Sequence, residues 1–449
     1  MSTSNPATRP DVAAIEDHLA YYQGQTKVQR LLFVASCDPV LRPAAYRAAL
    51  HELKSRTVDV NQYLAVYEDL WHRYRNEPWC SGGKVGDGGE AGSGGLVIPP
   101  HDEAWAEATR QANRATLSRL EAELRTYREN QLSESIGLGY RDLGDASARI
   151  GDGQSAIKYY QQARLNLVDS SQLVANHLRI IEQLAATHKL WSTLNASLDH
   201  LSKLKDDSIT PADSALVLAA RALYRLNQGD YHGAARHLMD ITAEPESLTM
   251  QILSPQDIAT LVMFCSLATF SRDEHRSLLF DHPWFIPYLE LNPVVFQTLN
   301  AFYNAQYREG FALLSEQLVL ARLDLHLAMP LEKGLLDQIR DAMLAAYMRP
   351  FSTVRLDTMA WAFDTPESTL ERRIFSLLQR PPAKGHSKRT ARIDGVTKTI
   401  TFNAVHPFQS SLAESEVLEE KLTQTARLIR SRVALTEAGM YISGGKRYV

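Results

Sequence analysis

Residues that could perform catalysis or bind a metal ion are present in this sequence, but they do not form a recognised pattern. The 14 histidines include His51-Glu52, which lacks the second histidine of a His-Glu-x-x-His zinc motif, and no His-x-His pair occurs. Cys37, Cys80 and Cys265 are too few and too far apart for a disulfide framework or a four-thiolate zinc site, and they suit a reducing compartment. We therefore expect no enzyme activity, no metal and no cofactor.

Glycine motifs for phosphate binding are equally incomplete. Gly151-Asp152-Gly153-x-x-Ala156 fits the glycine spacing of a dinucleotide site, but a helical pattern precedes it where that site needs a β-strand. Gly82-Gly83-Lys84 lacks the spacing of a Walker motif, and no Gly-x-Ser-x-Gly nucleophile motif occurs. The apolar neighbours of Cys37 would not activate its thiol, so a structural cysteine is the better interpretation.

The Gly-Asp motif belongs instead to a repeat. Gly151-Asp152 and Gly229-Asp230 are each followed by small and apolar residues, and Trp191 and Tyr307 stand at the equivalent position of two further copies. In such a turn, glycine adopts a positive φ and aspartate caps the next helix. One helical hairpin cannot bury its apolar face alone, so the repeat predicts an all-α, TPR-like solenoid of stacked hairpins.

The composition is that of an ordinary globular chain. With 45% hydrophobic and 22% charged residues and a net charge of −4, collagen-like, wholly disordered and disulfide-scaffold classes are excluded. The same charge gives no overall attraction to nucleic acid or anionic lipid. The most apolar run, residues 258–270, is too short to span a bilayer, and residues 1–10 lack the apolar core of a signal peptide. We therefore expect a soluble intracellular protein.

Changes of pattern along the chain predict six segments. Between Ser81 and Gly95, eight of fifteen residues are glycine, which indicates a flexible insertion. The predicted segments are a disordered N-terminus (1–10), an N-terminal helical block (11–77), a Gly-rich flexible insertion (78–101), a TPR-like helical solenoid (102–334), a winged-helix module (335–402), and a linker with a C-terminal assembly helix (403–449).

The winged-helix prediction depends on three helical patterns followed by a β-hairpin. The predicted strands are Thr390–Ile393 and Val396–Phe402, joined by Asp394-Gly395, a strong hairpin signal. The second strand would end the sheet, so its free edge could pair with a neighbouring subunit. The residues that we predict to lie in this interface are Val396, Lys398, Ile400 and Phe402.

A final helix is predicted over Leu412–Glu437, opened by the capping box Ser411-x-x-Glu414. Apolar residues recur along it at spacings of four, four, three and four, which gives one continuous stripe. We predict that this stripe is an assembly interface, although it could also pack on the chain's own solenoid. Its members are Leu418, Leu422, Ala426, Ile429 and Val433.

A basic stretch raises a different possibility for the winged-helix module. Residues 372–398 hold eight lysines or arginines and one acid, Asp394. Winged helices often bind DNA through such cations. Phe375 is the one phenyl, phenol or indole side chain among these charges, however, and the rest of the chain is slightly acidic. A solvated face or an acidic protein partner is the better interpretation, and direct nucleic-acid binding stays an alternative.

The arrangement of a helical solenoid, a winged helix and a C-terminal helix resembles the PCI-domain family, whose members are subunits of the proteasome lid, the COP-nine signalosome and translation initiation factor three. Within it, several motifs resemble the signalosome subunit 1 family more than its proteasome-lid paralogue. The resemblance covers residues 15–402 apart from the glycine tract. Its motifs are Tyr22-x-Gly24, Arg30-Leu31-x-Phe33-Val34-Ala35, Leu120-x3-Leu124-x2-Tyr127, Glu134-Ser135-Ile136, Asp142-Leu143-Gly144-Asp145, Asp257-Ile258, Tyr288-Leu289-Glu290-Leu291, Met359-Ala360 and Ala391-Arg392-Ile393-Asp394.

This resemblance implies a non-catalytic scaffold subunit. The signalosome removes a ubiquitin-like modifier from the cullins of cullin-RING ubiquitin ligases, and its zinc chemistry belongs to another subunit. The implied partners are the other PCI and isopeptidase-type subunits and, through the assembled complex, cullin-RING ligases, in the nucleus and cytoplasm. A proteasome-lid or initiation-factor scaffold of the same fold, and a nucleic-acid-binding winged-helix protein, are the alternatives.

Overall fold

The computed structural model describes residues 18–74, 101–167, 169–187, 191–203, 210–248, 252–379, 391–395, 397–402 and 407–437. The chain forms two compact units, Met1–Met343 and Leu344–Val449. The boundary between them lies inside one helix, nine residues after the predicted start of the winged-helix module at residue 335. The described residues are mainly helical with one small sheet, as the sequence predicted.

The first unit begins with three helices that pack around a shared apolar core. They are α2 (Gly24–Cys37), α3 (Arg42–Arg56) and α4 (Val60–Tyr74). Leu31, Leu53 and Leu70 come from different helices of this set and are each 3% exposed or less. We call residues 18–74 the N-terminal block. The predicted disordered N-terminus (1–10) and most of the predicted Gly-rich insertion lie outside the described residues.

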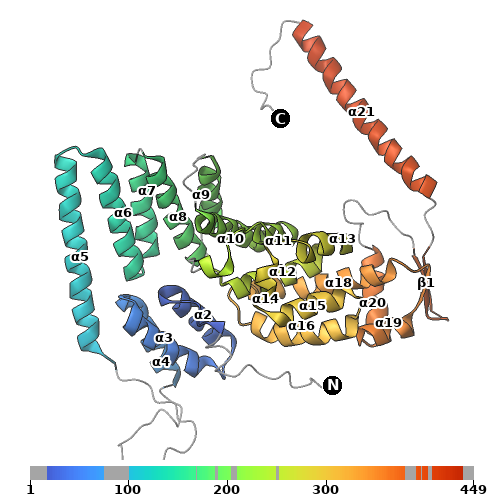
Figure 1. Cartoon of the computed structure of the whole chain (residues 1–449), viewed down its shortest axis with the longest axis horizontal. Helices are drawn as coiled ribbons and strands as arrows, with labels where there is room; N and C mark the ends of the chain where they lie inside the picture. The colour runs from blue at the N-terminus through green and yellow to red at the C-terminus, as the bar shows by residue number, and fades with distance from the viewer. Residues whose placement is uncertain are drawn as a thin grey trace, which may run out of the picture. The chain divides into compact units, whose positions relative to one another are not determined.

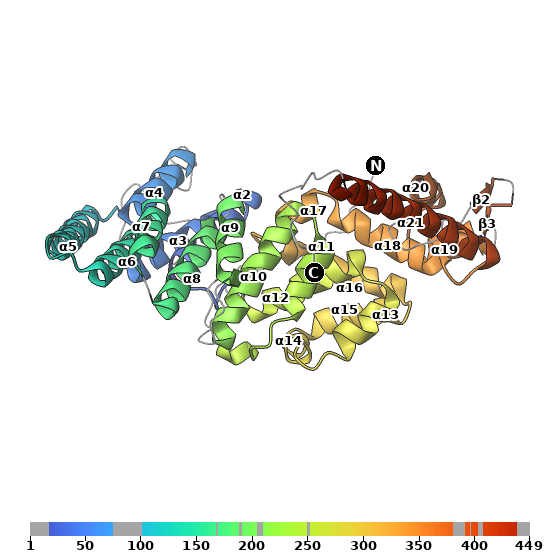
Figure 2. The same ribbon diagram turned by 90° about the horizontal axis from the view of Figure 1, so that it is seen from above.

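Paired helices follow the N-terminal block. Figure 1 shows α5 to α9 standing side by side in chain order, and Figure 2 shows the same order from above. This series consists of α5 (Glu103–Glu129), α6 (Ser133–Ile150), α7 (Gly153–Asn166), α8 (Ser170–Thr187), α9 (Trp191–Lys203), α10 (Pro211–Gln228) and α11 (Tyr231–Met239). The most apolar run of the sequence lies mainly in α12 (Pro255–Thr269), where every residue from Leu261 to Leu267 is buried.

The remainder of the first unit consists of shorter helices. They are η1 (Pro245–Ser247), α12 (Pro255–Thr269), α13 (Arg272–Glu274), the π-helical segment η2 (His275–Phe280), α14 (Ile286–Glu290), α15 (Pro293–Tyr303), α16 (Tyr307–Ala321), α17 (Ala328–Glu332) and the start of α18 (Leu335–Met348). None of the described helices is both long enough and apolar enough to cross a bilayer.

The predicted Gly-Asp turns are confirmed as the joints of the hairpins. Gly151 ends α6 with a φ of 91°, and the Asp152 carboxylate accepts a 3.1 Å hydrogen bond from the backbone N–H of Ser155 at the start of α7. Gly229 has a φ of 82° after α10, and Asp230 caps α11 in the same way. The joint before α16 has no glycine in its sequence, and Ala305 takes the positive φ there instead.

The second unit combines helices with a three-stranded sheet. Its elements are the end of α18, β1 (Thr353–Arg355), α19 (Leu356–Phe363), α20 (Glu367–Gln379), β2 (Ala391–Asp394), β3 (Thr399–Phe402) and α21 (Pro407–Glu437). The sheet is antiparallel in the order β1-β3-β2, with Ile400 of β3 opposite both Val354 and Ile393. Its core is made by the buried residues Val354, Leu356, Met359, Phe363, Leu370, Ile374 and Ile400.

The loop between β2 and β3 is wider than the predicted Asp394-Gly395 turn. Asp394 still belongs to β2 and lies opposite Thr399, the first residue of β3. The Thr397 hydroxyl donates to the Asp394 carboxylate at 2.6 Å, which closes a longer loop, and Lys398 takes the positive φ of 49°. The prediction of a two-residue turn was therefore wrong because the aspartate side chain stabilises a wider connection.

The C-terminal helix ends at Glu437 as predicted but begins earlier. It starts at Pro407, so the predicted capping box at Ser411 lies inside the helix and cannot cap it. Proline is favoured at the first position of a helix because its missing N–H would have no helical partner there. The proline was thus the correct start signal, and the prediction of a start at Leu412 was wrong.

Close packing of the first hairpin leads to a prediction at Gly144 of α6. A Cβ added there would lie 2.5 Å from the Tyr160 ring of α7. We expect Gly144→Ala to lower the free energy of unfolding by about 1–3 kcal/mol, because overpacking outweighs the gain in helix propensity. Urea unfolding followed by circular dichroism would measure this change. Gly395→Ala, which meets nothing within 4 Å, is the control, and equal stability of both variants would contradict the prediction.

Candidate functional site

The apolar stripe predicted on the C-terminal helix is exposed in this chain. Leu422 is 65% exposed and Ile429 61%, and Leu418, Ala426 and Val433 are exposed as well. Every α21 side chain for which burial is described is exposed. Contiguous apolar surface of this kind is unusual on a soluble protein unless something covers it. The assignment of the stripe as an assembly interface remains a prediction.

The wing residues predicted as an interface differ in their burial and in their contacts. Ile400 is fully buried and belongs to the core of the second unit. The Lys398 ammonium pairs with the Glu367 carboxylate, and the backbone N–H of Phe402 donates to the Ser352 carbonyl at 2.8 Å. Val396, together with residues 380–390 of the basic stretch, lies outside the described residues.

The prediction that the second wing strand has a free edge is wrong. β3 is the central strand, with β2 on one side and β1 on the other. Strand addition at β3 is therefore blocked, and the outer strands of the described sheet are β1 and β2. Strand β1 could not be recognised beforehand because it has only three residues, which is too short for a recognisable alternation of apolar and polar residues.

A buried ionic cluster that the sequence did not predict lies in the first unit. Arg30 of α2 is 4% exposed, and its guanidinium contacts two buried carboxylates. Its Nη1 donates to Asp324 Oδ2 at 3.0 Å, and its Nη2 lies 3.3 Å from Asp257 Oδ2 and donates to the Ile252 carbonyl at 3.1 Å. The guanidinium also lies 3.9 Å from the centre of the Tyr22 ring, a cation–π distance.

Tyr22 and Ser254 complete the cluster. The Tyr22 hydroxyl donates to the Asp257 carboxylate and accepts a 2.7 Å hydrogen bond from the backbone N–H of Ser254. Ser254 is the N-cap of α12, and its hydroxyl accepts from the backbone N–H of Asp257 at 3.0 Å. The start of α12 is thereby tied to the N-terminal block. Asp324 Oδ1 accepts from the backbone N–H groups of His326 and Leu327, which orders the chain before α17.

The pKa shifts follow from this geometry. Burial is the largest effect on the pKa of Asp324 and would raise it, but the Arg30 guanidinium, His326 and His18 together outweigh burial and hold the pKa at about 2. Burial likewise would lower the pKa of Arg30, but Asp257 and Asp324 raise it above its ordinary value. Burial first, and then the Asp257 charge, raises the pKa of Tyr22 well above its ordinary value. The tyrosine thus stays neutral and the Arg30–Asp324 ion pair stays charged around neutral pH.

The same cluster contains the one group of metal-ligand type found among the described residues. His18, Asp257 and Asp324 offer ligand atoms within 4.8 Å of one another, and His18 Nε2 lies 3.5 Å from Asp257 Oδ1. The Arg30 guanidinium, however, already contacts both carboxylates as their cation. A divalent ion would have to displace a buried arginine, so the chemistry of these residues is structural ion pairing.

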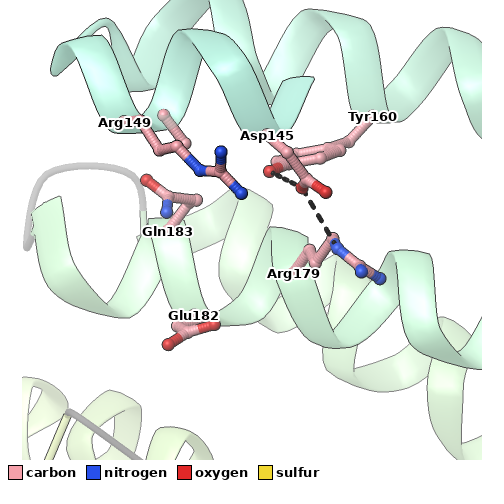
Figure 3. A pocket seen from close by; sticks show the side chains of 7 residues that line it. Asp145, Arg149, Tyr160, Arg179, Glu182 and Gln183 are labelled. Carbon is pink, nitrogen blue, oxygen red and sulfur yellow. Dashed lines mark hydrogen bonds and ion pairs between the residues drawn. The ribbon is translucent and has the colours of Figure 1, made fainter. Parts of the chain in front are cut away.

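A second polar site is an open pocket between α6, α7 and α8, with a volume of about 220 Å³ (Figure 3). Asp145 stands at its wall, accepting a 2.7 Å hydrogen bond from the Tyr160 hydroxyl and pairing with Arg179 Nε at 3.1 Å. Burial raises the pKa of Tyr160 above its ordinary value, and Asp145 adds to this effect. The lining residues are Asp145, Ala148, Arg149, Tyr160, Arg179, Glu182 and Gln183.

Sequence reasoning missed both polar sites because their members are distant in sequence. Arg30 and Asp257 stand in motifs that carried the family resemblance, but nothing assigned them a role. One local signal was available: Arg30 lies on the face of α2 that also carries the buried residues Val28, Leu31, Val34 and Ala35. A charged residue among buried positions of an amphipathic helix indicates a buried partner, although it does not identify that partner.

Comparisons with known proteins agree with the resemblance seen in the sequence. The family model described as 26S proteasome subunit RPN7 matches residues 102–277. COP9 signalosome complex subunit 1 of Neurospora crassa is 28% identical over 399 residues, which cover 88% of this chain and 87% of the relative. The protein of the same name in Arabidopsis thaliana is 29% identical, over 93% and 88%. A 26S proteasome non-ATPase regulatory subunit 6 homolog of Arabidopsis thaliana is 19% identical, over 73% and 83%.

The buried cluster predicts a large effect of removing its cation. Arg30→Met should lower the free energy of unfolding of the first unit by about 3–5 kcal/mol, because two buried carboxylates lose their counter-charge. Urea unfolding would measure the loss. Adding Asp324→Asn to Arg30→Met should recover part of it, since one unpaired charge disappears. No recovery in the double variant would contradict a charge-based explanation.

The low pKa of Asp324 predicts an acid-sensitive contribution to stability. Its pKa is about 2 in the folded chain against an ordinary 3.8. The stabilisation is therefore complete above about pH 4 and is lost as the pH falls toward 2, on the order of 2 kcal/mol in total. Unfolding free energies measured between pH 5 and pH 2 should fall less steeply for Asp324→Asn than for the wild type. Parallel pH profiles would show that Asp324 does not contribute.

Proposed function

We propose that this chain, a relative of COP9 signalosome complex subunit 1, is a non-catalytic scaffold subunit of a COP9 signalosome. The observation that carries the proposal is the similarity to those subunits over about nine-tenths of both chains. The proteasome relative is less similar and covers less of the chain. The complex would remove the ubiquitin-like modifier from cullins, with the chemistry performed by another subunit.

The finer architecture belongs to the same proposal. The repeated hairpins with Gly-Asp joints suit a TPR-like solenoid. In the second unit, the order of one helix, one strand, two helices and two strands suits a winged-helix module. In this proposal the other signalosome subunits are the direct partners, cullin-RING ligases are contacted through the assembled complex, and the protein is found in nucleus and cytoplasm.

Co-purification tests the assignment directly. The full-length chain, tagged and expressed at its native level, should co-purify with the remaining signalosome subunits as identified by mass spectrometry. Cullin deneddylation activity should appear in the purified complex and not in the isolated chain. Recovery of proteasome subunits instead would assign the chain to the proteasome lid and overturn the proposal.

The exposed stripe of α21 supplies a sharper prediction within the proposed complex. Leu422→Asp with Ile429→Asp should abolish assembly, because burying each carboxylate in an interface costs several kcal/mol. The melting temperature of the isolated chain should not change, since both side chains are exposed there. Size-exclusion chromatography of the reconstituted subunits would report assembly.

Gln424→Asp with Ser431→Asp is the matched control. These residues are also exposed, and they lie on the opposite side of the helix, about 200° from Leu422 and Ile429 respectively. The control adds the same charge to the same helix and should assemble normally. If both double variants assembled equally well, the stripe would not be an interface.

A further inference from the structure

The pocket between α6, α7 and α8 contains an arginine that forms no ion pair with any described residue. Asp145 is engaged by the Tyr160 hydroxyl and by Arg179 Nε. Arg179 Nη1 also donates to the carbonyl of Ala175 at 3.3 Å. The Arg149 guanidinium, one turn after Asp145 on α6, makes no ion pair or side-chain hydrogen bond with any described residue, and Figure 3 shows it reaching over the pocket.

The surroundings of Arg149 favour an anionic group with a planar shape. Arginine presents several N–H donors in a fork that matches the two oxygens of a carboxylate. Arg179 is occupied on the other side of the pocket, where its Nε pairs with Asp145 and its Nη groups are directed away from Arg149 (Figure 3). Gln183 adds an amide that can either donate or accept. A volume of about 220 Å³ is enough for one or two side chains of a peptide, but not for a folded domain.

Glu182 sets a limit on the ligand. It lines the same pocket and has no hydrogen-bond or ion-pair partner among the described residues. Burial raises its pKa, and nearby Arg179 opposes this rise only in part. A bare anion would be repelled by this carboxylate. A peptide, in contrast, also offers backbone N–H groups that can donate hydrogen bonds to the carboxylate. The pocket thus suits a carboxylate carried on a polypeptide better than a free inorganic anion.

We propose that this pocket binds a carboxylate of an extended protein segment, with Arg149 contacting its oxygens and Glu182 accepting a hydrogen bond from its backbone. The carboxylate comes either from an Asp or Glu side chain or from a chain terminus. The pocket belongs to the first unit and the α21 stripe to the second, and the two use different residues. The chemistry of the pocket does not depend on which complex the chain joins.

Fluorescence anisotropy with the full-length chain tests the proposal at physiological ionic strength, where weak non-specific attraction is largely screened. The first probe is a fluorescein-labelled eight-residue peptide with alternating Asp and Glu and an amidated end. The second has Asn and Gln at those positions and an amidated end, and the third has the same neutral sequence with a free carboxyl end. We expect the first or the third probe to bind about 10-fold more tightly than the second, which also identifies the source of the carboxylate.

Charge variants decide whether such binding occurs in this pocket. Arg149→Gln should weaken binding of the preferred probe about 10-fold. Glu182→Gln keeps an oxygen that can accept from the peptide backbone but removes a charge that repels the carboxylate, so it should strengthen binding about 3-fold. Arg114→Gln, which removes an exposed arginine of α5, should change binding less than 2-fold. An unchanged melting temperature confirms that each variant is folded.

Three results would overturn the proposal. They are equal binding of all three probes, equal weakening by Arg149→Gln and Arg114→Gln, and weakening by Glu182→Gln together with strengthening by Arg149→Gln. The last pattern would assign a basic ligand to the pocket. Co-purification of signalosome subunits with Arg149→Gln is measured separately, so failure of the pocket proposal is distinguishable from failure of the scaffold proposal.

Discussion

The first unit depends on one buried guanidinium that lies between two buried carboxylates. Arg30 belongs to the N-terminal block, Asp257 opens α12, and Asp324 precedes α17, so the cluster joins segments up to 294 residues apart. Each of these charges is acceptable away from water only while its partners are present. The N-terminal block therefore cannot be treated as an independent domain, although its three helices share a core of their own.

The cluster contributes specificity of arrangement more than net stability. An apolar replacement of similar shape would leave the same helices able to pack, because desolvation of the charges offsets much of their attraction. The hydrogen bonds, in contrast, allow only one register. Tyr22 bonds both Ser254 and Asp257, and Arg30 of α2 pairs with Asp257, so a shift of the N-terminal block would break these hydrogen bonds and the ion pair together. The orientation of the N-terminal block is fixed by this coupling.

How far the sequence predicted the structure depends on how local each signal is. The Gly-Asp joints were correct because glycine conformation and aspartate capping are decided within a few residues, as at Gly151 and Asp152. The same joint before α16 used Ala305, which no local pattern reveals. The central place of β3 and the pairing of Arg30 were missed for a similar reason, since both depend on partners tens to hundreds of residues away. The pocket at Asp145 was missed because its walls come from three helices.

The C-terminal helix differs from the N-terminal block in how it is stabilised. A helix in a folded protein normally gains most of its stability from burying an apolar face, yet the described side chains of α21 are all exposed. Length and charge order support it instead: it has 31 residues, with Glu419 before Arg427 and Arg430, as the helix dipole favours. A helix that forms without burial gains nothing in the isolated chain from Leu422 or Ile429. We therefore predict that the regular apolar stripe of this helix is buried against another chain, which is the role that the proposed scaffold subunit would require.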